Sequence, residues 1–75
     1  NPSSGQFFLE LPKQMKEDWS VQVFDAIGRQ VYRTVFEKIA AVDTQDLSLE
    51  HLPKGTYYLR LWNGVDSAGV LLVIE

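Results

Sequence analysis

The chain has 75 residues, of which 45% are hydrophobic and 23% are charged, and it contains no cysteine. This length fits one domain over residues 1–75, whose core supplies roughly 3–5 kcal/mol, and it argues against an elaborate buried active site or a disulfide framework. The formal net charge of −3 argues against nucleic acid as a partner, and no apolar run reaches the ~20 residues that a membrane-spanning helix needs.

Short runs of β-branched and aromatic residues recur along the chain, separated by Gly, Pro, Asn or Asp. A spacing of about 8–12 residues between such runs is typical of an antiparallel sandwich or barrel. In chain order, strands are predicted over residues 6–11, 19–25, 30–36, 43–48 and 56–62, and from residue 65 or 67 to residue 74. The sequence therefore predicts a compact, all-β, antiparallel β-sandwich of six or seven strands.

Alternating hydrophobicity supports two of these strands most clearly. Trp19, Val21 and Val23 share one predicted face, which is the period of a half-buried strand. The strand over 56–62 alternates in the same way. Residues 34–42 fit helical spacing as well as a strand that runs into a loop, and we favour the strand because of their β-branched content.

Glycine and proline residues mark the turns between the predicted strands. Gly28 can supply the positive φ of a tight hairpin. Pro53 presets φ in the turn before the strand over 56–62, and Gly55 accepts a left-handed conformation there. The dipeptide Asn63-Gly64 is a strong hairpin signal, so we expect it to return the chain into the last strand.

Residues that carry out catalysis or bind metals form no recognisable pattern. His51 is the only histidine, and without cysteine it lacks the partners of a zinc site. No serine stands in a Gly-x-Ser-x-Gly elbow, and most carboxylates fall in predicted turns, where they cap backbone N–H groups. We therefore expect a protein that is not an enzyme and that uses no metal or cofactor. The carboxylates considered are Glu10, Asp25, Asp43, Asp46, Glu50 and Asp66.

Tyr58, Arg60 and Trp62 share the outward face of the strand over 56–62 and form a candidate aromatic surface. Such a surface stacks on sugar rings or docks a partner, whereas the structural alternative is cross-strand packing that stabilises the sheet. Together with Trp19, these aromatic residues support a carbohydrate-binding module as an alternative function. A passive spacer or adhesion module is a second alternative.

Three segments of the sequence occur in an order that matches a known family. They are Asn1-Pro2-Ser3-Ser4-Gly5, then Val-Gln-Val-Phe-Asp-Ala-Ile-Gly-Arg-Gln-Val over 21–31, and Asp46-Leu47-Ser48 followed by Leu-Pro-Lys-Gly-Thr-Tyr-Tyr-Leu-Arg over 52–60. With the hydrophobic C-terminal strand, they resemble the C-terminal sorting domain of the type IX secretion system. The resemblance implies an Ig-like sandwich at the end of a longer secreted protein of a Gram-negative bacterium.

The function that this resemblance implies is that of a non-catalytic secretion signal. Its partners would be the type IX secretion machinery, an attached N-terminal cargo, and a surface sortase-like protease that removes the domain and joins the cargo to an anionic lipopolysaccharide. The protein would be in the periplasm in transit and then at the cell surface or outside the cell.

The resemblance also gives roles to single residues. Gly55 and Tyr57 match the Gly-x-Tyr element of the family, whose tyrosine is expected in the core. The other motif residues, which we expect to hold the fold, are Asn1, Pro2, Gly5, Gly28 and Pro53.

Recognition by the secretion machinery is expected in the last strand, at Leu72, Val73 and Ile74. We expect this strand to lie at a sheet edge, where unpaired N–H and C=O groups accept a strand from a receptor or from a second copy of the chain, giving a homodimer. Family members commonly carry lysine just before this strand, where this chain has Ser-Ala-Gly-Val over 67–70. A machinery that recognises this charge would treat the domain as a weaker signal or a variant subtype.

Overall fold

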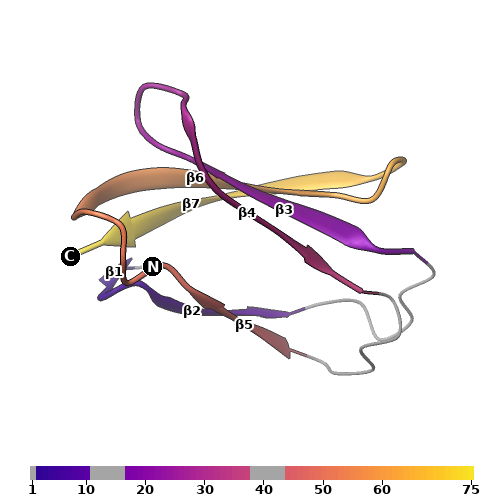
Figure 1. Cartoon of the computed structure of the whole chain (residues 1–75), viewed down its shortest axis with the longest axis horizontal. Coiled ribbons are helices and arrows are strands. Elements are labelled where there is room, and N and C mark those ends of the chain that lie inside the picture. Colours follow the sequence, from indigo (N-terminus) through magenta and orange to yellow (C-terminus); the bar gives the residue numbers. More distant parts are fainter. Residues whose placement is uncertain (1, 11–16, 38–43) are drawn as a thin grey trace.

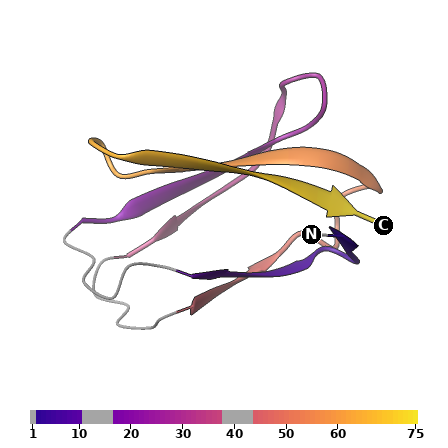
Figure 2. The ribbon, with the colours of Figure 1, turned by 180° about the vertical axis from the view of Figure 1, so that it is seen from behind.

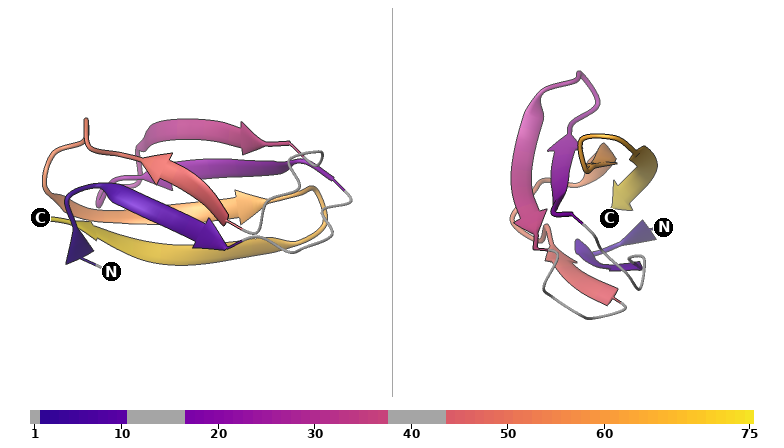
Figure 3. Two further views of the ribbon diagram at one scale, coloured as in Figure 1. Left: turned by 90° about the horizontal axis from the view of Figure 1, so that it is seen from below. Right: turned by 90° about the vertical axis from the view of Figure 1, so that its right-hand side faces the viewer.

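The computed structural model describes residues 2–10, 17–37 and 44–75, and its regular structure is entirely β (Figure 1). In chain order the strands are β1 (Pro2–Ser3), β2 (Gln6–Glu10), β3 (Trp19–Phe24), β4 (Gln30–Phe36), β5 (Thr44–Ser48), β6 (Gly55–Trp62) and β7 (Ser67–Ile74). Five of them form one sheet in the order β1-β7-β6-β3-β4, and β2 and β5 form a second sheet. The two sheets face each other as two layers, which the end-on view in Figure 3 shows.

The hairpin of β3 and β4 follows from the alternation of its first strand. Val21 and Val23 are completely buried, whereas Ser20 and Gln22 lie on the other face of the sheet. The register of the two strands shifts between Val23 and Phe24. This irregularity is a β-bulge whose extra residue is Val31 of β4, and Phe24 continues the alternation of β3 on the face opposite Val23.

The loop between β3 and β4 is closed by Asp25. Its backbone N–H donates a hydrogen bond to the Arg29 carbonyl at 2.9 Å, and its carboxylate accepts from the backbone N–H groups of Ile27 at 3.1 Å and Arg29 at 2.9 Å. Gly28 has a φ of +91° in this loop. The tight hairpin predicted at Gly28 is therefore confirmed.

Strands β6 and β7 form the longest hairpin, and they pair over all eight residues of each strand. The loop between them is closed by Asn63, whose side-chain oxygen accepts hydrogen bonds from the N–H groups of Val65 at 2.9 Å and Asp66 at 2.6 Å. The hairpin predicted at Asn63-Gly64 is confirmed. Of the two predicted starts of the last strand, Ser67 is the observed one.

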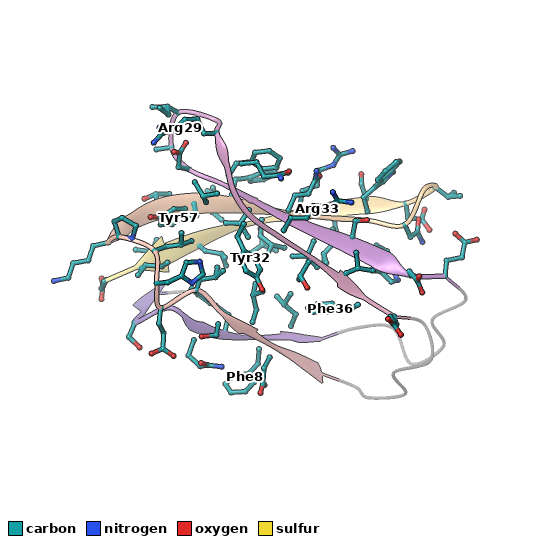
Figure 4. All side chains as sticks on the ribbon, in the orientation of Figure 1. Phe8, Arg29, Tyr32, Arg33, Phe36 and Tyr57 are labelled. Atoms are coloured by element: carbon teal, nitrogen blue, oxygen red, sulfur yellow. The ribbon has the colours of Figure 1, made fainter. Side chains whose placement is uncertain are left out.

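The hydrophobic core lies between the two sheets and takes side chains from both. In Figure 4, Tyr32 and Phe36 extend from β4 into the space between the sheets, whereas Phe8 extends from β2 away from it. Trp19 packs against the core from the inner side of β3. The buried core residues are Phe7, Val21, Val23, Phe36, Leu47, Leu49, Tyr57, Leu59, Leu72 and Ile74.

The order of the predicted strands is confirmed, with small differences at their ends. Residues 34–36 of the ambiguous run 34–42 form the end of β4, as the strand interpretation expected. Residues 38–42 of that run lie outside the described residues, as do residue 11 of the first predicted strand and residue 43 of the fourth.

Strand β1 was not among the predicted strands. It pairs with the end of β7 in parallel, with Pro2 opposite Val73 and Ser3 opposite Ile74. The expectation of a purely antiparallel sandwich is therefore wrong at this pair. A strand of two residues that includes a proline has no alternation from which it could be predicted.

Gly5 is the point at which the chain passes from the five-stranded sheet to the two-stranded sheet. Its carbonyl accepts a hydrogen bond from the Leu49 N–H at 2.7 Å, which extends the pairing of β2 with β5. Its φ is +113°, and a Cβ built at this position would lie 2.8 Å from Glu50 Cα. This crossing places β1 beside the end of β7 (Figure 2).

Candidate functional site

The last strand, β7, has two different sides in the sheet. One side pairs with β6 along the whole strand, and the other pairs with β1 at Val73 and Ile74. Within the described part of the chain, residues 67–71 of β7 have no neighbour on the side away from β6. We call residues 67–71 the open edge of β7, and Figure 3 shows this strand along the margin of the five-stranded sheet.

The three residues expected to carry recognition lie beyond this open edge. Leu72 and Ile74 are 2% and 4% exposed and belong to the core. Val73 and Ile74 are covered by β1. The expectation of an unpaired backbone edge is therefore wrong at Val73 and Ile74, because the N-terminal segment folds back onto them, and the unpaired stretch lies earlier in the strand.

The residues of the open edge are all exposed and uncharged. Residues 67–70, where family members were expected to carry lysine before the last strand, are inside β7 in this chain. Val70 is 41% exposed and Leu71 is 64% exposed, on opposite faces of the strand. The strand therefore presents both backbone groups and apolar side chains at the margin of the sheet.

The Gly-x-Tyr element lies at the start of β6. Tyr57 is 6% exposed, as expected of its core position, and its hydroxyl donates a hydrogen bond to the Pro53 carbonyl at 2.6 Å. This bond fixes the turn before β6 to the strand itself. Gly55 begins β6, opposite Ile74, and Asn1 lies outside the described residues.

Tyr58, Arg60 and Trp62 lie, as predicted, on one face of β6. We call this face of the five-stranded sheet, which is turned away from β2 and β5, the outer face. Tyr58 and Trp62 are each 44% exposed, and the Arg60 guanidinium lies 5.6 Å from the centre of the Trp62 ring. Trp19 lies on the inner face, on the same side of β3 as the buried Val21, as the alternation predicted. It therefore does not join Tyr58 and Trp62 in the surface that the carbohydrate-binding alternative would use.

The outer face also contains residues that the sequence did not single out. Strand register places Arg33 of β4 and Arg60 of β6 on either side of Gln22 of β3. Figure 4 shows Arg33 extending from the side of the sheet away from Phe8. The alternation of β4 could have predicted that Arg33 lies on one face with Val35. Its position beside Gln22 could not be predicted, because it depends on the register of β3 with β4, which shifts at the bulge.

An open cleft of about 230 Å³ lies between the β3–β4 loop and the start of β6. Its polar lining includes Asp25, Arg29, Lys54 and Thr56. The Arg29 Nε donates to the Asp25 carboxylate at 2.9 Å. The Arg29 backbone N–H, together with this ion pair and the Ile27 N–H, lowers the pKa of Asp25. The Asp25 carboxylate in the cleft thus already has hydrogen-bond partners and an ion pair within its own loop. This arrangement indicates that Asp25 closes the β3–β4 loop.

The other candidate chemical groups do not converge. The His51 ring contacts the Tyr32 ring, with 5.7 Å between ring centres. Among the described residues, no three His, Asp or Glu side chains are placed to hold a metal ion, and no polar or charged residue is buried. Within the same residues, no helix has the length and apolar character to cross a membrane.

Comparison with known proteins gives one match. The sequence model of a family described as "Secretion system C-terminal sorting domain" matches residues 1–75, the whole chain. No curated protein and no solved structure gave a match.

Proposed function

Since the chain belongs to the family of secretion system C-terminal sorting domains, we propose that it is a non-catalytic sorting signal. It directs an attached N-terminal cargo through the type IX secretion system and across the outer membrane. The family match along the whole chain is the observation that carries this proposal. The domain then has the role of an address rather than of a catalyst.

On this proposal the domain is the end of a longer secreted protein, and it accompanies its cargo through the periplasm. The cargo reaches the cell surface or the medium. There a sortase-like protease removes the domain and anchors the cargo at the surface. An exposed, uncharged strand margin close to the end of the chain supports recognition of the folded domain before that step.

We further infer an Ig-like topology for the sandwich. In Ig domains, strands C, F and G share a sheet that C′ extends in the variable type, and strands B and E belong to the facing sheet. Here β4, β3, β6 and β7 are neighbours in that order, and β2 and β5 form the facing sheet. The correspondence with C′, C, F and G opposite B and E supports the Ig-like assignment.

Recognition on this proposal occurs by strand addition at the open edge of β7. Unpaired backbone groups at a sheet margin bind an extended partner through main-chain hydrogen bonds, and alternate side chains add specificity. Val70 and Leu71 supply such side chains on the two faces. Leu72, Val73 and Ile74 then hold the strand in place through the core and through β1. The same edge also pairs with a second copy of itself in a homodimer.

The edge proposal is tested by the double variant Val70→Lys/Leu71→Lys. Both side chains are exposed, so the fold is retained, whereas lysine along a sheet edge opposes strand addition. We expect secretion of a fused reporter to fall at least about tenfold, the loss that ~1.4 kcal/mol of binding free energy produces.

The matched control is Val65→Lys, which makes the same type of change at an 81% exposed valine in the neighbouring loop. Secretion of this variant should equal that of the unaltered domain. Normal secretion of a folded Val70→Lys/Leu71→Lys domain would contradict recognition at the edge, although the sorting function itself would stand.

A further inference from the structure

The outer face of the five-stranded sheet carries a chemical pattern that the sorting function does not require. Strand register arranges its side chains in rows that cross the strands. The middle row contains Arg33, Gln22 and Arg60 in adjacent strands. Because neighbouring strands lie about 4.8 Å apart, the backbones of the two arginines are about 9.6 Å apart.

This basic row is flanked on both sides by exposed apolar side chains. One neighbouring row contains Phe24, Tyr58 and Leu71, and the other contains Val35 and Trp62. Four of these side chains, which are 44–64% exposed, count among the large exposed apolar residues of the described chain. Exposed apolar area of this kind, rimmed by polar groups, is typical of an interaction surface.

The charge of the outer face is opposite to that of the whole chain. The chain has a formal charge of −3, yet the residues that register places on the described outer face include two arginines and no aspartate or glutamate. Within the described residues, the one ion pair joins Arg29 to Asp25, in the β3–β4 loop. Arg33 and Arg60 therefore keep their charge available to an anionic ligand.

Two contacts hold this surface in a defined arrangement. The hydroxyl end of the Tyr58 ring occupies the space that a Cβ of Gly69 would fill, so the ring lies over β7. The Trp62 ring supports the Arg60 guanidinium through a cation–π contact at 5.6 Å. An aromatic ring and a guanidinium fork are thus presented side by side on the outer face.

We propose that the outer face binds an acidic polysaccharide. Pyranose rings stack on Tyr58, and the carboxylates of the polymer pair with Arg60 and Arg33, whose planar forks match carboxylate geometry. A face that is exposed across several strands suits an extended polymer. An acidic peptide would instead be expected to pair along a sheet edge.

The test measures retardation of the full chain in native gels that contain polygalacturonate, with neutral galactan, polyglutamate and poly(U) in parallel gels. We expect polygalacturonate to retard the chain most strongly, with less retardation as salt increases. The variant Arg33→Gln/Arg60→Gln should reduce the retardation constant at least about tenfold, and Tyr58→Ala should reduce it about fivefold, because ion pairing and stacking are lost.

Matched controls separate the outer face from net charge and from general hydrophobicity. Arg29→Gln/Lys54→Gln also removes two positive charges, but from the cleft. Ile27→Ala removes a 76% exposed apolar side chain from a loop. Both controls should bind as the unaltered chain does, and circular dichroism confirms that every variant is folded.

Several results would overturn the proposal. These are absence of retardation by polygalacturonate, equal retardation by neutral galactan, and an equal loss of binding in the cleft control. Stronger retardation by polyglutamate or poly(U) would assign the face to a peptide or a nucleic acid instead.

Discussion

Gly5 is the residue on which the connection between the two sheets depends most directly. Its positive φ is unfavourable for other residues, and a Cβ would collide with the backbone of Glu50 at 2.8 Å. The neighbouring atoms are main-chain atoms of the β5 side, so they cannot move aside as a flexible side chain would. The family's opening glycine therefore has a steric reason in this chain.

We predict that Gly5→Ala lowers the free energy of unfolding by about 3 kcal/mol or more, from strained φ and steric overlap together. Gly64→Ala is the control, because Gly64 has a φ of +98° but nothing lies within 4 Å of its added Cβ. That variant should lose only about 1–2 kcal/mol. Urea denaturation measures both, and equal losses would show that the Glu50 contact is unimportant.

Tyr57 and Tyr58 are adjacent, but their hydroxyl groups have different surroundings. The Tyr57 hydroxyl donates to the Pro53 carbonyl at 2.6 Å, so Tyr57→Phe should lower the free energy of unfolding by about 1 kcal/mol. The Tyr58 hydroxyl has no protein partner in the described residues, and Tyr58→Phe should change stability by less than about 0.5 kcal/mol. Thermal unfolding of the two variants distinguishes them, and a larger loss for Tyr58→Phe would be inconsistent with this assignment.

At the scale of elements, β7 combines a structural role with the proposed recognition. Leu72 and Ile74 are core residues, and each buried Leu or Ile side chain contributes about 2–5 kcal/mol. A domain of this size has a total stability of roughly 3–5 kcal/mol. Loss of secretion on removal of the strand end would therefore report unfolding as much as loss of a signal.

We predict that a chain lacking residues 72–75 is unfolded, with no cooperative thermal transition in circular dichroism. A chain lacking only the exposed Glu75 should melt like the complete domain. If the chain without residues 72–75 still unfolds cooperatively, the core role given to Leu72 and Ile74 is wrong.

The elements that could be predicted from the sequence are those with a local signal. The alternation of Val21 and Val23 and the turn residues Gly28 and Asn63 lie within a few residues of the structures that they specify. Strand β1 could not be predicted, because its two residues acquire their structure only by pairing with the distant end of β7.

The same distinction applies to the candidate site. Tyr58, Arg60 and Trp62 could be placed together because they alternate in one strand. The neighbouring position of Arg33 depends on the register of β3 with β4, which includes a bulge. The open edge of β7 depends on how far β1 extends, which no local pattern indicates.

At the scale of the whole molecule, the second sheet gives the first its two distinct faces. β2 and β5 cover the inner face and bury Val21, Leu59 and Leu72. The outer face and the open edge remain exposed on the same five-stranded sheet. The proposed edge site uses mainly the backbone of β7, and the proposed polymer site uses mainly Arg33, Arg60 and Tyr58. Leu71 belongs to both sites, so a partner at the edge and a polymer on the face would meet at this residue.

The most direct test of the sorting function fuses residues 1–75 to the C-terminus of a periplasm-targeted fluorescent reporter. The fusion is followed in cells with a working type IX secretion system and in cells without one. The proposed function predicts reporter at the cell surface or in the medium of the competent cells only, with a decrease in size if the domain is removed. Reporter retained in the periplasm of both strains, with the domain folded, would contradict it.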